Sequence, residues 1–190
     1  MEKFCVVVSL SGSVAARVRR LQRLLSIKTG SSASVRFWKP HLTVGSGIIV
    51  PRKQLASVMA QFRSALKATS LFSVRVRGYG FMEKWAGGIF GKSPYVAYLQ
   101  IENSPPLRAL AKTVKKVTHH YPLFYRQPWP YTPHVTLAFS DLTNAGFLKA
   151  KAFLKGKTFA GTILVDHVAL LHKDRQGRWV EYKRFTLGSR

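Results

Sequence analysis

The chain carries two related hexapeptides, KPHLTV at residues 39–44 and TPHVTL at residues 132–137. In each, a histidine follows a proline and a threonine stands two positions later, which gives the pairs His41 with Thr43 and His134 with Thr136. A proline disfavours helical backbone at the residue ahead of it, so both segments begin as extended chain. Side chains two positions apart on a strand share one face. We therefore predict two short strands that each present an imidazole and a hydroxyl on the same side.

The sequence around the two motifs repeats. The motif histidines are 93 positions apart, and shifting residues 6–8 by the same 93 positions reaches residues 99–101, within a second predicted strand. The order strand, helix, motif strand, helix, strand survives the shift. We therefore predict a single domain, residues 1–190, made of two intimately packed lobes at about residues 1–78 and 95–171, with a C-terminal hairpin strand at 178–186.

Hydrophobic periodicity, capping residues and turn residues locate the elements of both copies. The first copy is expected to contain a strand at 4–10, a helix at 13–27 capped by Ser13, the His41 strand, a helix at 53–67 and a strand at 71–76. The second is expected to contain a strand at 95–101, a helix at 104–117, the His134 strand, a helix at 144–154 and a long strand at 162–171. Residues 78–91 are expected to form a hairpin between the lobes, and residues 121–131 a loop that delivers the second motif.

The composition is that of a globular protein. The chain is 46% hydrophobic, and no stretch approaches the roughly 18 uninterrupted apolar residues of a membrane span. Glu2 offsets Lys3 ahead of the first apolar run, which favours a strand over a signal peptide. A single cysteine, Cys5, excludes an internal disulfide and favours a reducing compartment. We therefore expect a cytoplasmic monomer without a membrane partner.

The charge is strongly unbalanced. The chain has 31 Lys and Arg against 7 Asp and Glu, a formal net charge of +24. Such a charge attracts polyanions, of which nucleic acid is the commonest. The cations are spread over several predicted helices rather than gathered in a tail, so solvated helix faces are an alternative explanation. The charge favours RNA or a small nucleotide as the partner.

Two imidazoles and two hydroxyls suffice for acid–base chemistry on a phosphodiester, provided that the fold brings the two motif strands together. The alternative is a pair of edge-strand histidines with satisfied hydrogen bonds and no chemical role. No set of His, Cys, Asp and Glu has the spacing of a metal site, so neither a metal nor another cofactor is expected.

The motifs resemble those of the 2H phosphoesterase superfamily, the LigT-like group that contains 2′-5′ RNA ligases and RNA 2′,3′-cyclic phosphodiesterases. That family is defined by two His-x-Thr/Ser motifs, which correspond here to residues 41–43 and 134–136. The stretches 78–81 and 133–138 also look typical of it, and the resemblance covers essentially the whole chain. It implies an α+β fold: a duplicated α/β unit with pseudo-two-fold symmetry, whose two mostly antiparallel sheets face a central cleft with helices outside.

The resemblance also implies an activity, the metal-independent hydrolysis of 2′,3′-cyclic phosphates of RNA ends or cyclic nucleotides to 2′-phosphates. One of His41 and His134 would activate water and the other would protonate the departing ribose oxygen, while Thr43 and Thr136 hold the non-bridging oxygens. Which histidine is the acid stays open. A reversible 2′-5′ RNA ligase, a 2′-5′ oligonucleotide phosphodiesterase and a basic RNA-binding module without catalysis stay open as well.

Four further residues near the motifs are candidates for substrate binding. Lys39 and Arg126 are candidates for phosphate contact, with solvated cations as the alternative. Trp129 and Tyr131 precede the second motif and are candidates for stacking on a base, with packing of the loop onto the lobe as the alternative. Trp38, before the first motif, is expected in the core.

Overall fold

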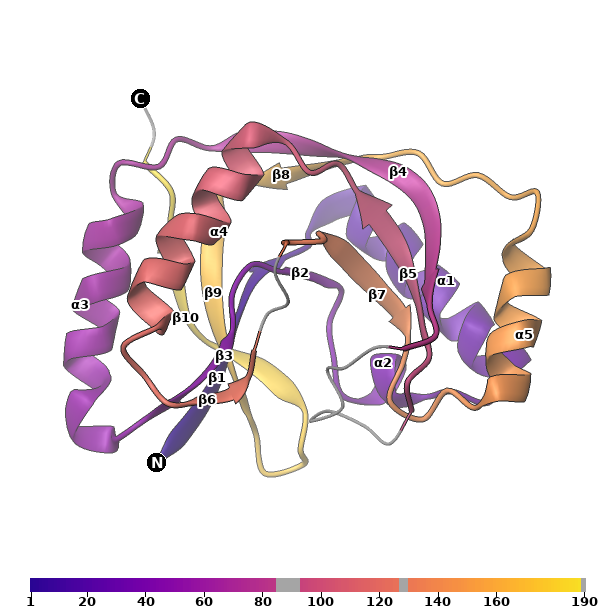
Figure 1. Cartoon of the computed structure of the whole chain (residues 1–190), viewed down its shortest axis with the longest axis horizontal. Helices are drawn as coiled ribbons and strands as arrows, with labels where there is room; N and C mark the ends of the chain where they lie inside the picture. Colours follow the sequence, from indigo (N-terminus) through magenta and orange to yellow (C-terminus); the bar gives the residue numbers. More distant parts are fainter. Residues whose placement is uncertain (85–92, 127–129, 189–190) are drawn as a thin grey trace.

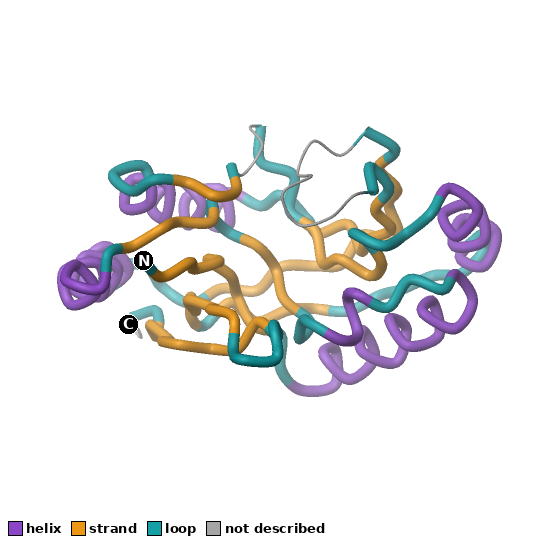
Figure 2. The backbone as a smooth tube through the Cα atoms, turned by 90° about the horizontal axis from the view of Figure 1, so that it is seen from below, coloured by secondary structure: helices purple, strands orange, loops and turns teal. Residues whose placement is uncertain are grey.

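Two antiparallel sheets lie side by side in the computed structural model, with helices on their outer flanks (Figure 1). The structure describes residues 1–84, 93–126 and 130–188. Seen from below, the strands occupy the middle of the molecule and the helices lie toward its two ends (Figure 2). This arrangement confirms the predicted α+β fold.

The first sheet has six strands and is centred on β1 (Glu2–Ser9). One edge of β1 pairs with β9, which pairs in turn with β10. The other edge pairs with β3 near the start of β1 and with β2 near its end, and β3 pairs with β6. The bounds are β2 His41–Thr43, β3 Gly47–Val50, β6 Leu123–Tyr125, β9 His167–Lys173 and β10 Trp179–Thr186.

The second sheet has four strands in the order β7-β5-β4-β8. Its strands are β4 Phe72–Met82, β5 Val96–Ile101, β7 His134–Ala138 and β8 Thr162–Val165. Two helix pairs flank the sheets: α1 contacts α5 beside the second sheet, and α3 contacts α4 beside the first (Figure 1). The helices are α1 Gly12–Thr29, α2 Ala33–Arg36, α3 Leu55–Leu66, α4 Pro105–Thr118 and α5 Asn144–Leu154, with a 3-10 turn η1 at Arg52–Gln54.

The two sequence copies exchange a strand. The 93-residue offset carries β1 onto β5, β2 onto β7 and β4 onto β9. However, β4 pairs with β5 and β9 pairs with β1, so each copy supplies its last strand to the sheet of the other copy. Neither sheet is built from one copy alone, and the two halves cannot part without breaking a β-ladder.

Three predicted segments differ from the structure. The strand predicted at 162–171 is two strands, β8 in the second sheet and β9 in the first, which separate at Asp166. Residues 78–82 extend β4, so the predicted hairpin joins two strands of one sheet rather than two lobes; residues 85–92 lie outside the described structure. The predicted loop 121–131 contains β6. In each case the pairing partner is distant in the sequence, and local periodicity does not report it.

Capping residues set several helix ends. The side chains of Ser104 and Thr143 accept hydrogen bonds from backbone N–H groups in the first turns of α4 and α5. Helix α1 begins one residue earlier than predicted, behind Ser11. The prediction that Ser13 caps this helix is therefore wrong, because Ser13 lies inside its first turn.

The motif strands bury alternate side chains. Leu42 on β2 and Val135 on β7 are fully buried, and Leu137 is 1% exposed. The histidines and threonines between them are half-buried. Since alternate residues of a strand point to opposite faces, the apolar side chains anchor each strand in the core and leave its imidazole and hydroxyl on the other face.

Candidate active site

Both motifs line one pocket where the two sheets meet. β7 is the edge strand of its sheet, β2 pairs with β1 alone, and these two strands contact each other. The structure thereby brings together all four motif side chains, His41, Thr43, His134 and Thr136, in the wall of the same pocket. The remaining lining residues are Cys5, Gln22, Ser34, Trp38, Gly45, Gly47, Val96, Tyr125 and Phe139.

The two imidazoles are held in the same way. Nδ1 of His41 lies 2.8 Å from the carbonyl oxygen of Lys39, and Nδ1 of His134 lies 2.9 Å from that of Thr132. A carbonyl oxygen only accepts, so Nδ1 of each ring carries the donated proton. In the neutral ring, Nε2 is then the basic nitrogen. Each imidazole can accept a proton at Nε2 and return it.

Burial lowers the pKa of both imidazoles. The pKa of His41 falls to about 4, chiefly because its charged form loses solvent; the bond to the Lys39 carbonyl opposes the shift, and the nearby His134 adds to it. Desolvation also lowers the pKa of His134, against the opposing effect of the Thr132 carbonyl. Both rings are therefore neutral at pH 7 in the unliganded protein, and mutual repulsion disfavours two protons on the pair.

We expect an NMR titration of the free protein to place the midpoint of His41 near pH 4 and that of His134 below 6.5. Because the unfolded chain takes up these protons near pH 6.5, the pair contributes stability above that pH and loses it as the pH falls toward the folded-state pKa values. Added phosphate is expected to raise both midpoints, since an anion favours the protonated rings. A midpoint of 6.5 or higher in the free protein would show that the pair is not desolvated.

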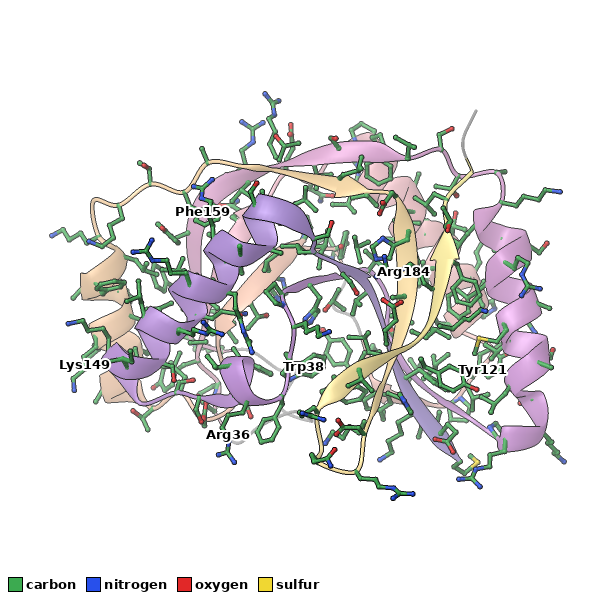
Figure 3. The ribbon with its side chains drawn as sticks, turned by 180° about the vertical axis from the view of Figure 1, so that it is seen from behind. Arg36, Trp38, Tyr121, Lys149, Phe159 and Arg184 are labelled. Atoms are coloured by element: carbon green, nitrogen blue, oxygen red, sulfur yellow. The ribbon has the colours of Figure 1, made fainter. Side chains whose placement is uncertain are left out.

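Aromatic rings flank both imidazoles. Trp38 stacks on His41 with ring centroids 4.8 Å apart, and Tyr98 meets the ring of His134 edge-on at 5.3 Å. Trp38 also stacks on Trp179 of β10 at 4.9 Å. Figure 3 shows Trp38 near the middle of the molecule, between α2 and the β9–β10 hairpin. Trp38, expected in the core, is half-buried: its side chain packs against buried apolar residues and also forms part of the pocket wall.

Two polar residues of α1 fix the backbone around both motifs. Gln22 is 3% exposed and donates from Nε2 to the carbonyl of Thr136 at 2.9 Å. Arg19, one turn earlier, donates to the carbonyls of Ser34 at 3.1 Å and Trp38 at 2.9 Å. Carbonyls at the end of a helix lack intrahelical partners, so the guanidinium satisfies the end of α2 and the chain that follows it. Helix α1 is thus a common anchor for Trp38 and for the second motif.

The carboxylate of Asp141 joins the two motif regions from the other side. It follows β7 and accepts from the hydroxyl of Ser31 at 2.6 Å, from the N–H of Ser32 at 2.8 Å and from the N–H of Ala33 at 3.1 Å, at the start of α2. Partial burial raises the pKa of Asp141, but these hydrogen bonds outweigh it and hold the pKa below its usual value. Asp141, which follows the second motif, therefore caps α2, the helix that precedes the first motif.

Asp141→Ala is expected to lower the free energy of unfolding by about 1–2 kcal/mol, because the N–H groups at the start of α2 lose their acceptor. We also expect slower turnover at temperatures where the variant is folded, since α2 positions Trp38. Asp174→Ala is the matched control: Asp174 accepts similar hydrogen bonds from Gln176 and Arg178 within the β9–β10 turn. Denaturant unfolding and steady-state rates measure both effects, and equal rate losses in the two variants would contradict a specific role for Asp141.

Three of the four secondary candidates lie within the described structure, and none of these three lines this pocket. Lys39 is exposed, and Arg126 lines a neighbouring cavity. Tyr131 is 3% exposed, and its hydroxyl donates to the carbonyl of Thr43 at 2.7 Å. A ring so buried offers no face to a base, which favours the packing role over stacking. Trp129 lies outside the described residues.

The remaining ionisable groups of the pocket stay protonated at neutral pH. Desolvation raises the pKa of the Cys5 thiol, against the opposing charge of Lys173, and it raises the pKa of the Tyr125 phenol. Among the described residues, no three His, Cys, Asp or Glu side chains gather as a metal site. The two imidazoles are therefore the described pocket groups suited to proton transfer.

The described helices are all too short or too polar to cross a membrane.

These features define the class of the 2H phosphoesterases. A family model described as the 2′-5′ RNA ligase superfamily matches residues 10–177, and the chain belongs to that family. The match confirms the resemblance that the motifs indicated.

Several known proteins are similar to this chain in sequence or in fold. The Bacillus cytotoxicus protein named "Putative phosphoesterase Bcer98_0945" is 25% identical over 149 residues, 78% of this chain and 79% of the relative. The Thermus thermophilus protein TT0787 superposes with a TM-score of 0.65 at 20% identity, covering 100% of both chains. E. coli LigT complexed with 3′-AMP superposes with a TM-score of 0.64 at 14% identity, covering 99% of both chains. At these identities the structural likenesses show the fold.

Proposed function

We propose that the protein is a metal-independent phosphodiesterase that opens the 2′,3′-cyclic phosphate of RNA ends or nucleotides to a 2′-phosphate. The observation that carries the proposal is the pair of imidazoles in one pocket, each with Nδ1 bound to a backbone carbonyl and Nε2 left for proton transfer. A threonine follows each histidine by two residues and lines the same pocket.

In the proposed reaction, water attacks phosphorus and passes a proton to Nε2 of the neutral imidazole. The bond between phosphorus and the ribose 3′ oxygen breaks, and this oxygen takes a proton from Nε2 of the other, protonated imidazole. One water is added overall, and the product carries a 2′-phosphate and a free 3′-hydroxyl. A single proton shared by the coupled pair supplies one acid and one base, and the charge of the bound phosphate favours its uptake.

The hydroxyls and the net charge support a phosphate substrate. Thr43 and Thr136 are proposed to donate hydrogen bonds to the non-bridging oxygens, where negative charge grows in the transition state. The formal charge of +24 attracts anions to the protein. The structures of E. coli LigT complexed with 3′-AMP and with phosphate concern that protein, and they support a nucleotide phosphate as a ligand for this fold.

The direct test is incubation of the purified protein with a 2′,3′-cyclic nucleotide, with the position of the product phosphate assigned by phosphorus NMR. We expect a 2′-phosphate and a rate that EDTA leaves unchanged. A 3′-phosphate product or a rate abolished by EDTA would contradict the proposal. Binding of RNA without turnover of any cyclic phosphate would instead favour a non-catalytic module.

The same groups would join RNA if another nucleophile took the place of water. A 5′-hydroxyl in place of water would attack the cyclic phosphate and form a 2′-5′ linkage, and cleavage of that linkage is the return step. Supplying RNA halves with a cyclic phosphate and a 5′-hydroxyl measures this reaction, and hydrolysis faster than joining is the expected result.

Because one chain contains both motifs, we propose that a monomer is active, which sedimentation of the active protein tests.

A further inference from the structure

A second cavity lies next to the catalytic pocket. Its volume is about 450 Å³, within the range of about 300–1,000 Å³ that is typical of small-molecule sites. One wall comes from the C-terminal half of α4 and the residue after it, including Lys115, Thr118 and His119. The opposite side comes from residues 44–46, which follow the first motif, and from Arg126 after β6.

The two cavities share one lining residue. Gly45 lines both of them, directly after the first motif strand. A Cβ at Gly45 would lie 2.4 Å from Cγ1 of Val114, so α4 packs closely against this part of the chain. Tyr131 lines the second cavity and binds the carbonyl of Thr43 through its hydroxyl. Gly45 is thus the point at which the two cavities approach each other.

The second cavity is suited to an anion. Lys115, His119 and Arg126 surround it, and none of the 7 acidic residues of the chain is in its lining. Nδ1 of His119 lies 2.6 Å from the carbonyl of Lys116, so Nδ1 carries the proton, and in the neutral ring the other nitrogen can accept a hydrogen bond from a ribose hydroxyl. Val44, Ala111 and Leu123 contribute apolar surface. Cationic groups around an apolar floor match the phosphate and ribose of a nucleotide unit.

We propose that this cavity is an upstream subsite, formed by Lys115, His119 and Arg126, which binds the ribose-phosphate of the nucleotide preceding the cyclic phosphate. The proposal rests on the proposed function and narrows the substrate from a mononucleotide to an RNA chain. Arg126 is a candidate for phosphate contact, and it lines the second cavity rather than the catalytic pocket. The subsite would supply the phosphate that Arg126 binds.

The test compares two substrates that differ only upstream of the reacting group: a 2′,3′-cyclic mononucleotide, and a trinucleotide that ends in the same cyclic nucleotide. We expect the wild-type kcat/KM to favour the trinucleotide. Arg126→Glu is expected to lower the ratio of trinucleotide to mononucleotide kcat/KM by about tenfold, because a cation on the upstream phosphate becomes an anion. Lys115→Gln, which removes one charge from an exposed position of α4, is expected to lower the ratio in the same direction.

Arg20→Glu is the matched control, since Arg20 is an exposed residue of α1 beside the other sheet and undergoes the same change of charge. It is expected to keep the wild-type substrate ratio. An equal fall of the ratio in Arg20→Glu and Arg126→Glu would overturn the subsite in favour of general attraction, as would an unchanged ratio in both subsite variants. Weaker inhibition by inorganic phosphate without a change of the ratio would identify an anion site that RNA does not use.

A binding measurement separates failure of the subsite from failure of the proposed function. Fluorescence anisotropy of a trinucleotide with a terminal 3′-phosphate requires no turnover. We expect Arg126→Glu to weaken this binding about tenfold and to reduce the salt slope by about 1, as for the loss of one phosphate contact. If the wild-type protein turned over neither substrate, the proposed function would fail, and unchanged trinucleotide binding in Arg126→Glu would overturn the subsite independently.

Discussion

Replacing His134 with alanine is expected to lower kcat for a 2′,3′-cyclic nucleotide by about 10²- to 10⁴-fold, because the reaction loses one of its two proton-transfer groups. His41→Ala is expected to lose as much. The two rings have equivalent backbone hydrogen bonds. The proposed reaction needs one ring to accept a proton from water and the other ring to donate a proton to the ribose oxygen. Rates at saturating substrate and pH 7 measure both losses.

The two losses are not expected to add. Groups that act as a unit lose most of their effect when one is removed, so the double variant should lie within about tenfold of either single variant. His134→Asn offers a more conservative change, because its amide can still donate to the Thr132 carbonyl that holds the imidazole. A near-normal rate in any of these variants would exclude the two-histidine mechanism.

The control for the histidine series is His120→Ala. His120 is exposed at the end of α4 and does not line the catalytic pocket. It tests whether loss of an imidazole elsewhere on the protein affects turnover of a cyclic mononucleotide, and a wild-type rate is expected. Circular dichroism and denaturant unfolding establish that the slow variants are folded at the assay temperature.

The sequence predicted the motif strands well because their determinants are local. Proline sets the extended backbone ahead of His41 and His134, and the apolar residues between the polar ones define the buried face. Helix α5 begins and ends at the predicted residues, since Thr143 caps its start and the apolar positions keep helical spacing. Such signals lie within one turn or one strand of the residue concerned.

The sequence did not predict how the two copies share their strands. Residues 162–165 and 167–171 both read as parts of one strand, but they pair with β4 and β1, which are far apart in the sequence. A break of one residue at Asp166 is enough to send the chain from one sheet to the other. Partner choice depends on packing between distant segments, which local periodicity does not encode.

The supporting residues of the site were missed for a similar reason. Trp38 is an aromatic residue beside a motif, but its stacking on His41 and the hydrogen bond from Arg19 to its carbonyl are contacts that local periodicity does not report. Gln22 did carry a signal, since this polar residue lies among the buried apolar residues of α1. A buried amide needs a partner, and its partner is the Thr136 carbonyl of the second motif.

The hydroxyls of the two motifs are expected to contribute almost as much to kcat as the imidazoles. Thr43→Val and Thr136→Val should each lower kcat by about 10²- to 10³-fold, because a donor to the non-bridging oxygens is lost where charge develops in the transition state. Valine keeps the β-branched shape and the strand preference of threonine, so the half-buried positions remain filled.

Two further substitutions separate the hydroxyl from its surroundings. Thr43→Ser and Thr136→Ser keep the donor and should retain most of the wild-type kcat, whereas a purely structural role of the methyl group would make serine as harmful as valine. Thr132→Val is the matched control: Thr132 is exposed, and its backbone carbonyl, which holds His134, is unaffected by the change. If kcat stayed within a few-fold of wild type in both motif valine variants, the threonines would not bind the reacting phosphate, and the paired imidazoles would have to stabilise its charge on their own.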